Sequence, residues 1–267
     1  MIVIFTAVHG AYEVAKNCFN AIDSVVAVPF LHYIGDDFSP GDDSDWYMAE
    51  QGFIRRDGNL IGERIYYHCK ELGATESPNL GLSMGHAFDV ARLYGAEALL
   101  LVESDVVVQP GLVDAFREAH NAHGPTTGAV APLYTEVGGD TITTYGGMGG
   151  NIPQKLGIDL GTKIGSWDQT EIRTDILEWT HTACLWIPKS TLDRPEIQPD
   201  PDFGLYYCDH DLSYQIMQAG LDVIVTDRAV AGHSRNAAST GIKWPKQIDR
   251  DMAELSAKQQ LYTKWDI

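Results

Sequence analysis

Two carboxylates separated by one residue interrupt an apolar run over residues 99–108. Side chains alternate along an extended chain, so Glu103 and Asp105 are expected on the same side of a strand end. Two such anions repel by about 4 kcal/mol at 4 Å and a protein-like dielectric, unless a cation or a shared proton relieves them. The pattern therefore predicts a divalent-cation site at the end of a buried strand. The alternative is a solvated loop, or the N-cap of a helix that begins near Pro110.

A second acidic pair, Asp209 and Asp211, comes just before a helical pattern that ends at Gly220. Carboxylates in a first helical turn are stabilised by free backbone N–H groups, so capping is the alternative to a catalytic role. Further on, a short apolar run ends in His233, which is a candidate metal ligand. A lone histidine is more often structural.

Composition bounds the class of protein. The chain has 267 residues, of which 44% are hydrophobic, enough for one sizeable core. Its net charge of -18 and pI of about 4.7 argue against nucleic acid or an anionic membrane as a partner. Four scattered cysteines show no zinc-ligand spacing, and we find no signal peptide or membrane-spanning run. A soluble, cytoplasmic protein is expected.

Apolar periodicity predicts one mixed-sheet α/β domain. An early strand, helix and strand form a crossover unit, whose parallel strands open at the carboxyl edge of the sheet where ligands bind. Residues 134–169 are rich in glycine and are expected to form an irregular insertion. The pattern predicts helices over residues 14–22, 63–72, 83–94 and 110–120, and a further helix that has Asp209 and Asp211 at or just before its first turn and stops at Gly220. It predicts strands over 2–5, 25–34, 97–102, 128–131, 223–225 and 229–233.

Five motifs follow one another along the chain: Asp36-Asp37-Phe38-Ser39, Asn79-Leu80-Gly81, Glu103-Ser104-Asp105, the aromatic and acidic block 203–220, and Ala229-Val230-Ala231-Gly232-His233. In this order they resemble the GT-A-fold glycosyltransferases, and among them family 2, which includes rhamnosyltransferase-like enzymes. The resemblance covers about residues 1–236 as a GT-A domain. Residues 237–267 are expected to form an amphipathic helical tail that packs on this domain or on a second subunit.

The resemblance implies a nucleotide-diphospho-sugar transferase with a Rossmann-like sheet. It assigns Asp105 and His233 as ligands of Mn²⁺ or Mg²⁺, and Glu103 to the metal, a metal-bound water or the ribose. It assigns Asp209 as the base that accepts the proton of the acceptor hydroxyl in an inverting reaction. The nucleotide site would take Asp36, Asp37 and Asn79 together with Thr6, Ala7 and His9 of the first strand end.

The sequence also departs from the family pattern. Glu103 is longer than the usual aspartate, and Cys208 stands where an acid is usual. Position 85–86 holds Gly85-His86 where Arg or Asn is expected. These departures leave metal binding intact as an expectation and bear on the acceptor side.

Further residues could shape the sugar pockets. Trp179, His181, Asp211 and Trp186 are candidates for the donor or acceptor sugar, since sugar faces pack on aromatic rings. The alternative for the tryptophans is core packing. Arg235, Lys243 and Lys246 could close over the diphosphate, and the alternative is a solvated tail.

Two other classes of protein remain open. A sugar-1-phosphate nucleotidyltransferase should carry a glycine-rich basic loop after its first strand, whereas residues 7–11 contain one glycine and no Lys or Arg. A noncatalytic module that binds a nucleotide sugar or a cation is the other alternative. The partners expected are a nucleotide-diphosphate sugar donor and a carbohydrate or other small hydroxyl acceptor, while the oligomeric state stays open.

Overall fold

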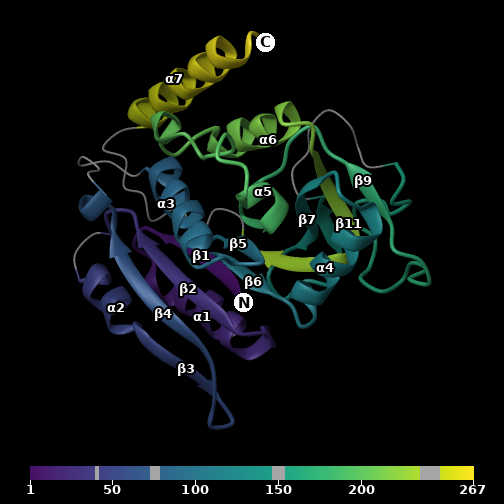
Figure 1. Cartoon of the computed structure of the whole chain (residues 1–267), viewed down its shortest axis with the longest axis horizontal. Helices are drawn as coiled ribbons and strands as arrows, with labels where there is room; N and C mark the ends of the chain where they lie inside the picture. Colours follow the sequence, from purple (N-terminus) through teal and green to yellow (C-terminus); the bar gives the residue numbers. More distant parts are fainter. Residues whose placement is uncertain (40–41, 73–78, 146–153, 235–246) are drawn as a thin grey trace.

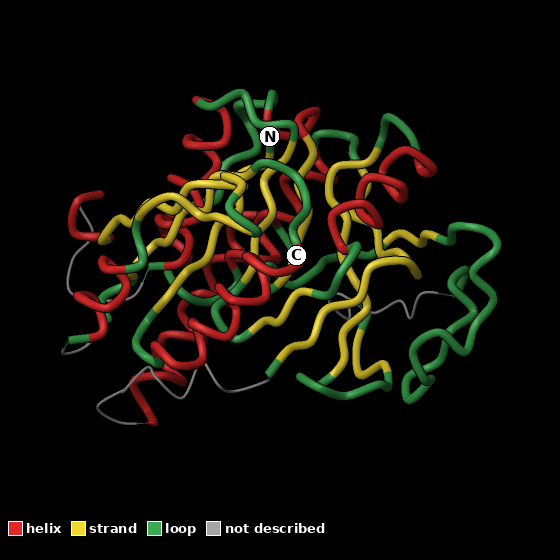
Figure 2. Tube along the Cα trace, turned by 90° about the horizontal axis from the view of Figure 1, so that it is seen from below, coloured by secondary structure: helices red, strands yellow, loops and turns green. Residues whose placement is uncertain are grey.

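A mixed β-sheet with helices on both faces forms the body of the protein (Figures 1 and 2). The structure, a computed structural model, describes residues 1–39, 42–72, 79–145, 154–234 and 247–267. Within these residues the strand order is β3-β4-β2-β1-β5-β10-β7-β11-β6, with β8 beside β7 and β9 beside β11. The predicted mixed α/β architecture is therefore confirmed.

The N-terminal half contains the predicted parallel crossover. β1 pairs in parallel with both β2 and β5, and β2 pairs in parallel with β4. Its elements are β1 (Ile2–Val8), α1 (Tyr12–Val25), β2 (Phe30–Asp36), α2 (Asp43–Ala49), β3 (Gly52–Arg56), β4 (Asn59–His68) and the 3-10 helix η1 (Cys69–Leu72).

The largest differences from the sequence-based prediction in this half concern β4 and the start of β2. Residues 63–68, predicted as helix, are the end of β4, where Arg64 and Tyr66 alternate inward and hydrogen-bond to β2. Pairing with β2 thus overrides the local pattern. The second strand begins at Phe30 instead of Val25, because α1 continues to Val25.

The C-terminal half completes the sheet. The apolar run 99–108 is two strands, because the chain turns at residues 103–105 and β6 then pairs with the far strand β11. The run 223–233 is one strand with a register irregularity between Val225 and Val230. The elements are α3 (Leu80–Leu93), β5 (Ala98–Val102), β6 (Val106–Val108), α4 (Leu112–His123), β7 (Thr127–Thr135), β8 (Ile142–Thr144), β9 (Thr174–Ile176), β10 (Cys184–Pro188), α5 (Lys189–Leu192), the 3-10 helix η2 (Pro201–Phe203), α6 (Cys208–Gln218), β11 (Asp222–His233) and α7 (Gln247–Trp265).

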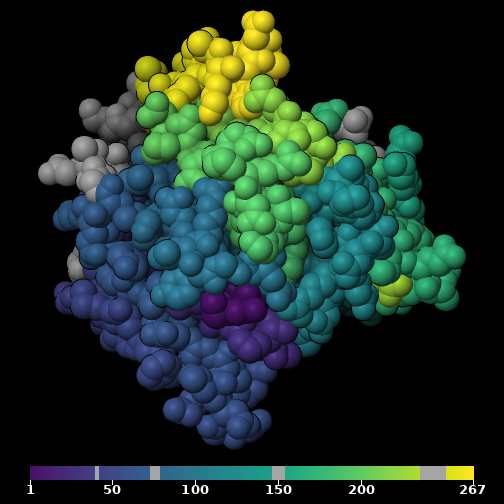
Figure 3. Space-filling view, in the orientation of Figure 1, coloured from purple at the N-terminus to yellow at the C-terminus, as the bar shows by residue number. Residues whose placement is uncertain are grey.

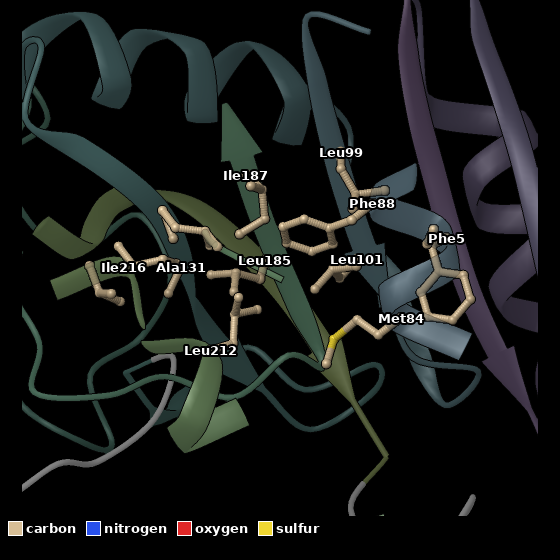
Figure 4. Packing of buried hydrophobic residues seen from close by; sticks show 14 of the residues in the cluster. Phe5, Met84, Phe88, Leu99, Leu101, Ala131, Leu185, Ile187, Leu212 and Ile216 are labelled. Carbon is tan, nitrogen blue, oxygen red and sulfur yellow. The ribbon is translucent and has the colours of Figure 1, made fainter. Parts of the chain in front are cut away.

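Alternate residues of the strands form two hydrophobic clusters, one on each face of the sheet. Leu99 and Leu101 of β5 face the cluster that α3 and α6 complete, whereas Leu100 and Val102 face the cluster of α1 and α4. Figure 4 shows the first cluster, in which Met84 and Phe88 of α3 and Leu212 and Ile216 of α6 pack around β5 and β10.

Two further regions bear on the predictions. The glycine-rich stretch expected to be irregular contains β8 and a turn-rich segment over 154–169, while residues 146–153 lie outside the described residues. α7 lies beside α6 (Figure 1). Among the described residues, none of the helices combines the length and the apolar character needed to cross a bilayer.

Candidate active site

The turn after β5 carries an acidic cluster to the end of β11. β6 pairs with β11 so that Val106 lies opposite His233, and the backbone N–H of Ser234 donates to the carbonyl of Asp105 at 3.0 Å. One ligand atom from each of Glu103, Asp105 and His233 lies within 4.8 Å of the others. The His233 Nε2 to Asp105 Oδ1 distance is 3.4 Å. The structure thus brings together the three residues that the sequence predicted as metal ligands.

The electrostatics of this cluster suit a cation. Burial, together with the neighbouring Asp105 carboxylate, raises the pKa of Glu103 to about 7, and His233 opposes the shift. A divalent cation beside Glu103 would instead favour its ionised form and lower its pKa. Carboxylate oxygens with one imidazole nitrogen match the donors that Mn²⁺ and Mg²⁺ accept, so the residues present fit the predicted ion.

A cavity of about 310 Å³ extends from Glu103 to the N-terminal end of α6. Its wall includes Thr182 before β10, Asp209 and His210 of α6, and Glu254 of α7. A second, smaller cavity of about 10 Å³ also reaches Glu103. Glu103 of the acidic cluster and Asp209 therefore line the same cavity.

Asp209 lies in the first turn of α6, as predicted. The helix starts directly after Tyr207, whose φ of 63° is left-handed. Oδ1 of Asp209 accepts from the backbone N–H and from Nδ1 of His210, both at 2.8 Å, and Oδ2 accepts from Nδ1 of His181 at 3.2 Å. Burial by itself would raise the pKa of Asp209, but the hydrogen bonds from the two histidines outweigh it and hold the pKa below its usual range.

Trp179 completes this group. Its ring stacks on His210, with centroids 3.9 Å apart and planes 20° apart, and meets His181 edge-on at 4.8 Å. The aromatic contacts hold both imidazoles in place beside Asp209. Trp186, by contrast, is buried and stacks on Phe116, so the core interpretation holds for it.

The residues predicted for the nucleotide meet where β1 and β2 end. The ring of His9 donates to the carbonyl of Asp37, and Asp37 Oδ1 accepts from the backbone N–H of Asn79 at 2.7 Å. Asn79 caps α3 by accepting from Leu82. Asp36 is buried, and its carboxylate accepts from Ser39, Ser44 and Tyr66. These side chains hold the loops at this edge in shape.

Three further predicted residues, Thr6, Ala7 and Asp211, lie in different parts of the structure. Thr6 is fully buried within β1 and its hydroxyl lies 3.0 Å from His32, so its side chain is part of the interior of the sheet. Ala7 lines the small cavity next to Glu103. Asp211 is fully buried and faces α7, where Lys264 and Trp265 bind it. Arg235, Lys243 and Lys246 lie outside the described residues.

Two residues of this region, His210 and Glu254, had no role in the sequence-based prediction. His210 was visible as an imidazole between two acids, but its contact with Asp209 was not predicted. Glu254 reaches the cavity from α7, and no local motif marks it.

Comparisons with known proteins bear on the fold. No protein-family model and no curated protein matches the chain. Solved structures do: a crystal structure of GalNAc-T7 with UDP, GalNAc and Mn²⁺ matches 87% of this chain and 43% of that one, at 12% identity and a TM-score of 0.59. A crystal structure of S. aureus TarS 1-349 matches 90% of this chain and 62% of that one, at 11% identity and a TM-score of 0.56.

The chain thus spans less than two thirds of either matched structure. At these identities the likeness concerns the fold. The mixed sheet flanked by helices is that of GT-A glycosyltransferase structures.

Proposed function

We propose that this protein is a metal-dependent, inverting glycosyltransferase that moves a sugar from a nucleotide-diphosphate donor to an acceptor hydroxyl. The observation that carries the proposal is that Glu103, which clusters with Asp105 and His233, lines one cavity with Asp209 on a glycosyltransferase fold. A GalNAc-T7 structure with this fold contains UDP and Mn²⁺ together.

The donor would lie across the carboxyl edge of the sheet. The loops held by His9, Asp36, Asp37 and Asn79 would bind the nucleotide, and Ala7 would border its path toward Glu103. Asp105 and His233 would hold the ion, with Glu103 bound to it or to the ribose. A divalent ion at this place supplies positive charge that stabilises the leaving diphosphate.

The acceptor would enter from the side of α6. Inversion requires the attacking oxygen and the leaving diphosphate to lie on opposite faces of the sugar, with a proton acceptor beside the attacking oxygen. Asp209 lies in the cavity wall and is ionised at neutral pH, because its histidine hydrogen bonds keep its pKa low. In an oxocarbenium-like transition state the hydroxyl becomes acidic late, so a well-placed weak base suffices.

A thermal-shift panel tests the proposal. The protein is heated with UDP, GDP, CDP, dTDP or ADP, each with and without Mn²⁺, since a ligand that binds the native state raises the melting temperature. We expect one nucleotide to stabilise only when Mn²⁺ is present, and Asp105→Ala to abolish that shift. Asp209→Asn should keep the shift and lose sugar transfer. No shift with any nucleotide would contradict the proposal.

One observation keeps a noncatalytic binding module as a second candidate. Cys208 is buried, and burial raises the pKa of its thiol, so the position is neutral where the resemblance has an acid. A module of this kind would show the nucleotide-dependent shift without release of nucleoside diphosphate from any nucleotide sugar. Turnover of a donor would exclude it.

A further inference from the structure

Asp209 is held on both sides by histidines that present the same ring nitrogen. Its Oδ1 bonds to Nδ1 of His210 and its Oδ2 to Nδ1 of His181. An ionised carboxylate only accepts hydrogen bonds, so each Nδ1 carries the hydrogen. In a neutral ring with its hydrogen on Nδ1, Nε2 carries the lone pair and can accept a proton.

The two histidines differ in what surrounds them. The His210 side chain is 20% exposed, lies flat on Trp179 and is near Tyr207, with ring centroids 5.0 Å apart. The His181 side chain is 45% exposed and touches Trp179 only at an edge. Within the described chain, Nε2 of His181 makes no hydrogen bond. His181 is therefore the member of the group with an accessible lone pair.

Two carboxylates act on His181. Asp209 faces it from α6, and Glu103 interacts with it electrostatically from the end of β5, since the imidazoles of His181 and His233 both lower the pKa of Glu103. His181 also directly precedes Thr182, which lines the cavity together with Glu103 and Asp209. Under the proposed function, the acceptor enters this cavity.

We propose that His181 is the group that takes the proton of the acceptor hydroxyl, and that Asp209 is its positioning residue. The proposal rests on the proposed glycosyl transfer and refines its acceptor side. The acceptor oxygen bonds to the anomeric carbon as the bond from that carbon to the diphosphate oxygen breaks and its electron pair leaves with the diphosphate. The hydroxyl proton moves to Nε2 of His181, and Asp209 stabilises the resulting imidazolium before it returns the proton to water.

NMR of the histidine rings tests the arrangement without any substrate. In ¹⁵N-labelled protein, with signals assigned by His181→Gln and His210→Gln, His181 should show hydrogen on Nδ1 and a lone pair on Nε2. Asp209→Asn should weaken this tautomer preference, because the carboxylate that accepts the hydrogen bond from Nδ1 is gone. Hydrogen on Nε2 of neutral His181 in the wild type would overturn the proposal.

Kinetics tests the role. The assay uses Mn²⁺ and sugar donors of whichever nucleotide stabilises the protein in the thermal-shift panel. Release of nucleoside diphosphate, by hydrolysis or by transfer to an acceptor, should rise with pH through the pKa that NMR gives for His181. His181→Gln should lose this rise and 10²- to 10⁴-fold in kcat, while the nucleotide-dependent thermal shift stays. Asp209→Asn should also lower kcat and leave the thermal shift in place.

His123→Gln is the matched control. His123 makes a similar ring-to-carboxylate pair with Asp222, at 3.0 Å, between α4 and β11. It should keep both the rate and the pH profile. A His181→Gln rate within threefold of wild type would show that Asp209 acts alone and would overturn the proposal. If no nucleotide sugar releases nucleoside diphosphate, by contrast, the proposed function itself is contradicted, and this proposal with it.

Discussion

The indole N–H of Trp265 donates a hydrogen bond to Oδ1 of Asp211, with the two atoms 2.8 Å apart. Nζ of Lys264 lies 2.9 Å from the same carboxylate and 2.8 Å from Asp200. The last turn of α7 is therefore attached to the first turn of α6, and Figure 3 shows α7 seated beside the green surface of that region. Because Glu254 of α7 lines the cavity, this attachment also fixes part of the cavity wall.

Trp265→Phe should destabilise this attachment. The change leaves the fully buried Asp211 carboxylate without one of its donors, which costs about 1–3 kcal/mol of unfolding free energy. Denaturant unfolding measures the loss, and hydrogen exchange should show α7 amides losing protection first. The matched control is Lys258→Met, where the side chain lies over the Tyr262 ring and should change stability by under about 0.5 kcal/mol. Equal effects of the two changes would contradict this account of α7.

The ion pair between Lys264 and Asp200, which also attaches the end of α7, should weaken in acid. Burial would raise the pKa of Asp200, but the hydrogen bond from Lys264 outweighs it and the pKa is lowered. A lowered folded-state pKa means that the stabilisation is complete above the unfolded-state value and is lost as the pH falls below about 4. Trp265 fluorescence and unfolding curves from pH 7 to pH 3 measure this. Lys264→Met should flatten that part of the profile, and an unchanged profile would count against the pair.

Gly81→Ala should disturb the contact between α3 and the backbone of Asp200, the residue just before η2. A Cβ at Gly81 would lie 2.5 Å from the carbonyl oxygen of Asp200, which is backbone and cannot swing away. Overpacking of this kind costs about 1–3 kcal/mol. Gly85→Ala, one turn further along α3, meets nothing nearer than 3.3 Å and serves as the control. Thermal unfolding of the two variants should show a larger loss for Gly81→Ala than for Gly85→Ala, whose contacts need to give by only a few tenths of an ångström.

Removal of one ligand should weaken Mn²⁺ binding. Under the proposed function, His233→Ala and Asp105→Asn should each lower Mn²⁺ affinity at least tenfold, because each takes one donor from the set within 4.8 Å. Calorimetry or Mn²⁺ electron paramagnetic resonance measures this directly. Asp114→Asn on α4, a largely exposed acid that pairs with Arg117, is the control and should bind Mn²⁺ as the wild type does. Undiminished affinity in both ligand variants would place the ion elsewhere.

Local patterns predicted the residues at the end of each strand better than the contacts between them. Glu103 and Asp105 could be paired from their spacing within an apolar run, whereas His233 joined them only through the resemblance to GT-A glycosyltransferases. The turn at 103–105 could not be predicted, since β6 is a strand only through its pairing with β11. Likewise, residues 63–68 form a strand because they pair with β2.

The contacts of Asp209 and Asp211 show a second limit. Successive helical residues are turned by 100°, so two acids two positions apart point to nearly opposite sides, about 200° from one another. Asp209 faces the cavity and Asp211 faces α7. The sequence placed both in the first turn, but which side would be solvent, substrate or another helix depends on α7 and on His181, which lie far away in the chain.

The turn between β5 and β6 has a consequence for folding. Glu103 ends a strand at the middle of the sheet, while His233 belongs to a strand next to its last edge, so the acidic cluster forms only when both have been assembled. Contacts between such distant parts of a chain carry a large loop-closure entropy and tend to form late. Partly folded chains would lack the complete ligand set, and an ion that needs all three ligands would bind only molecules in which the sheet is finished.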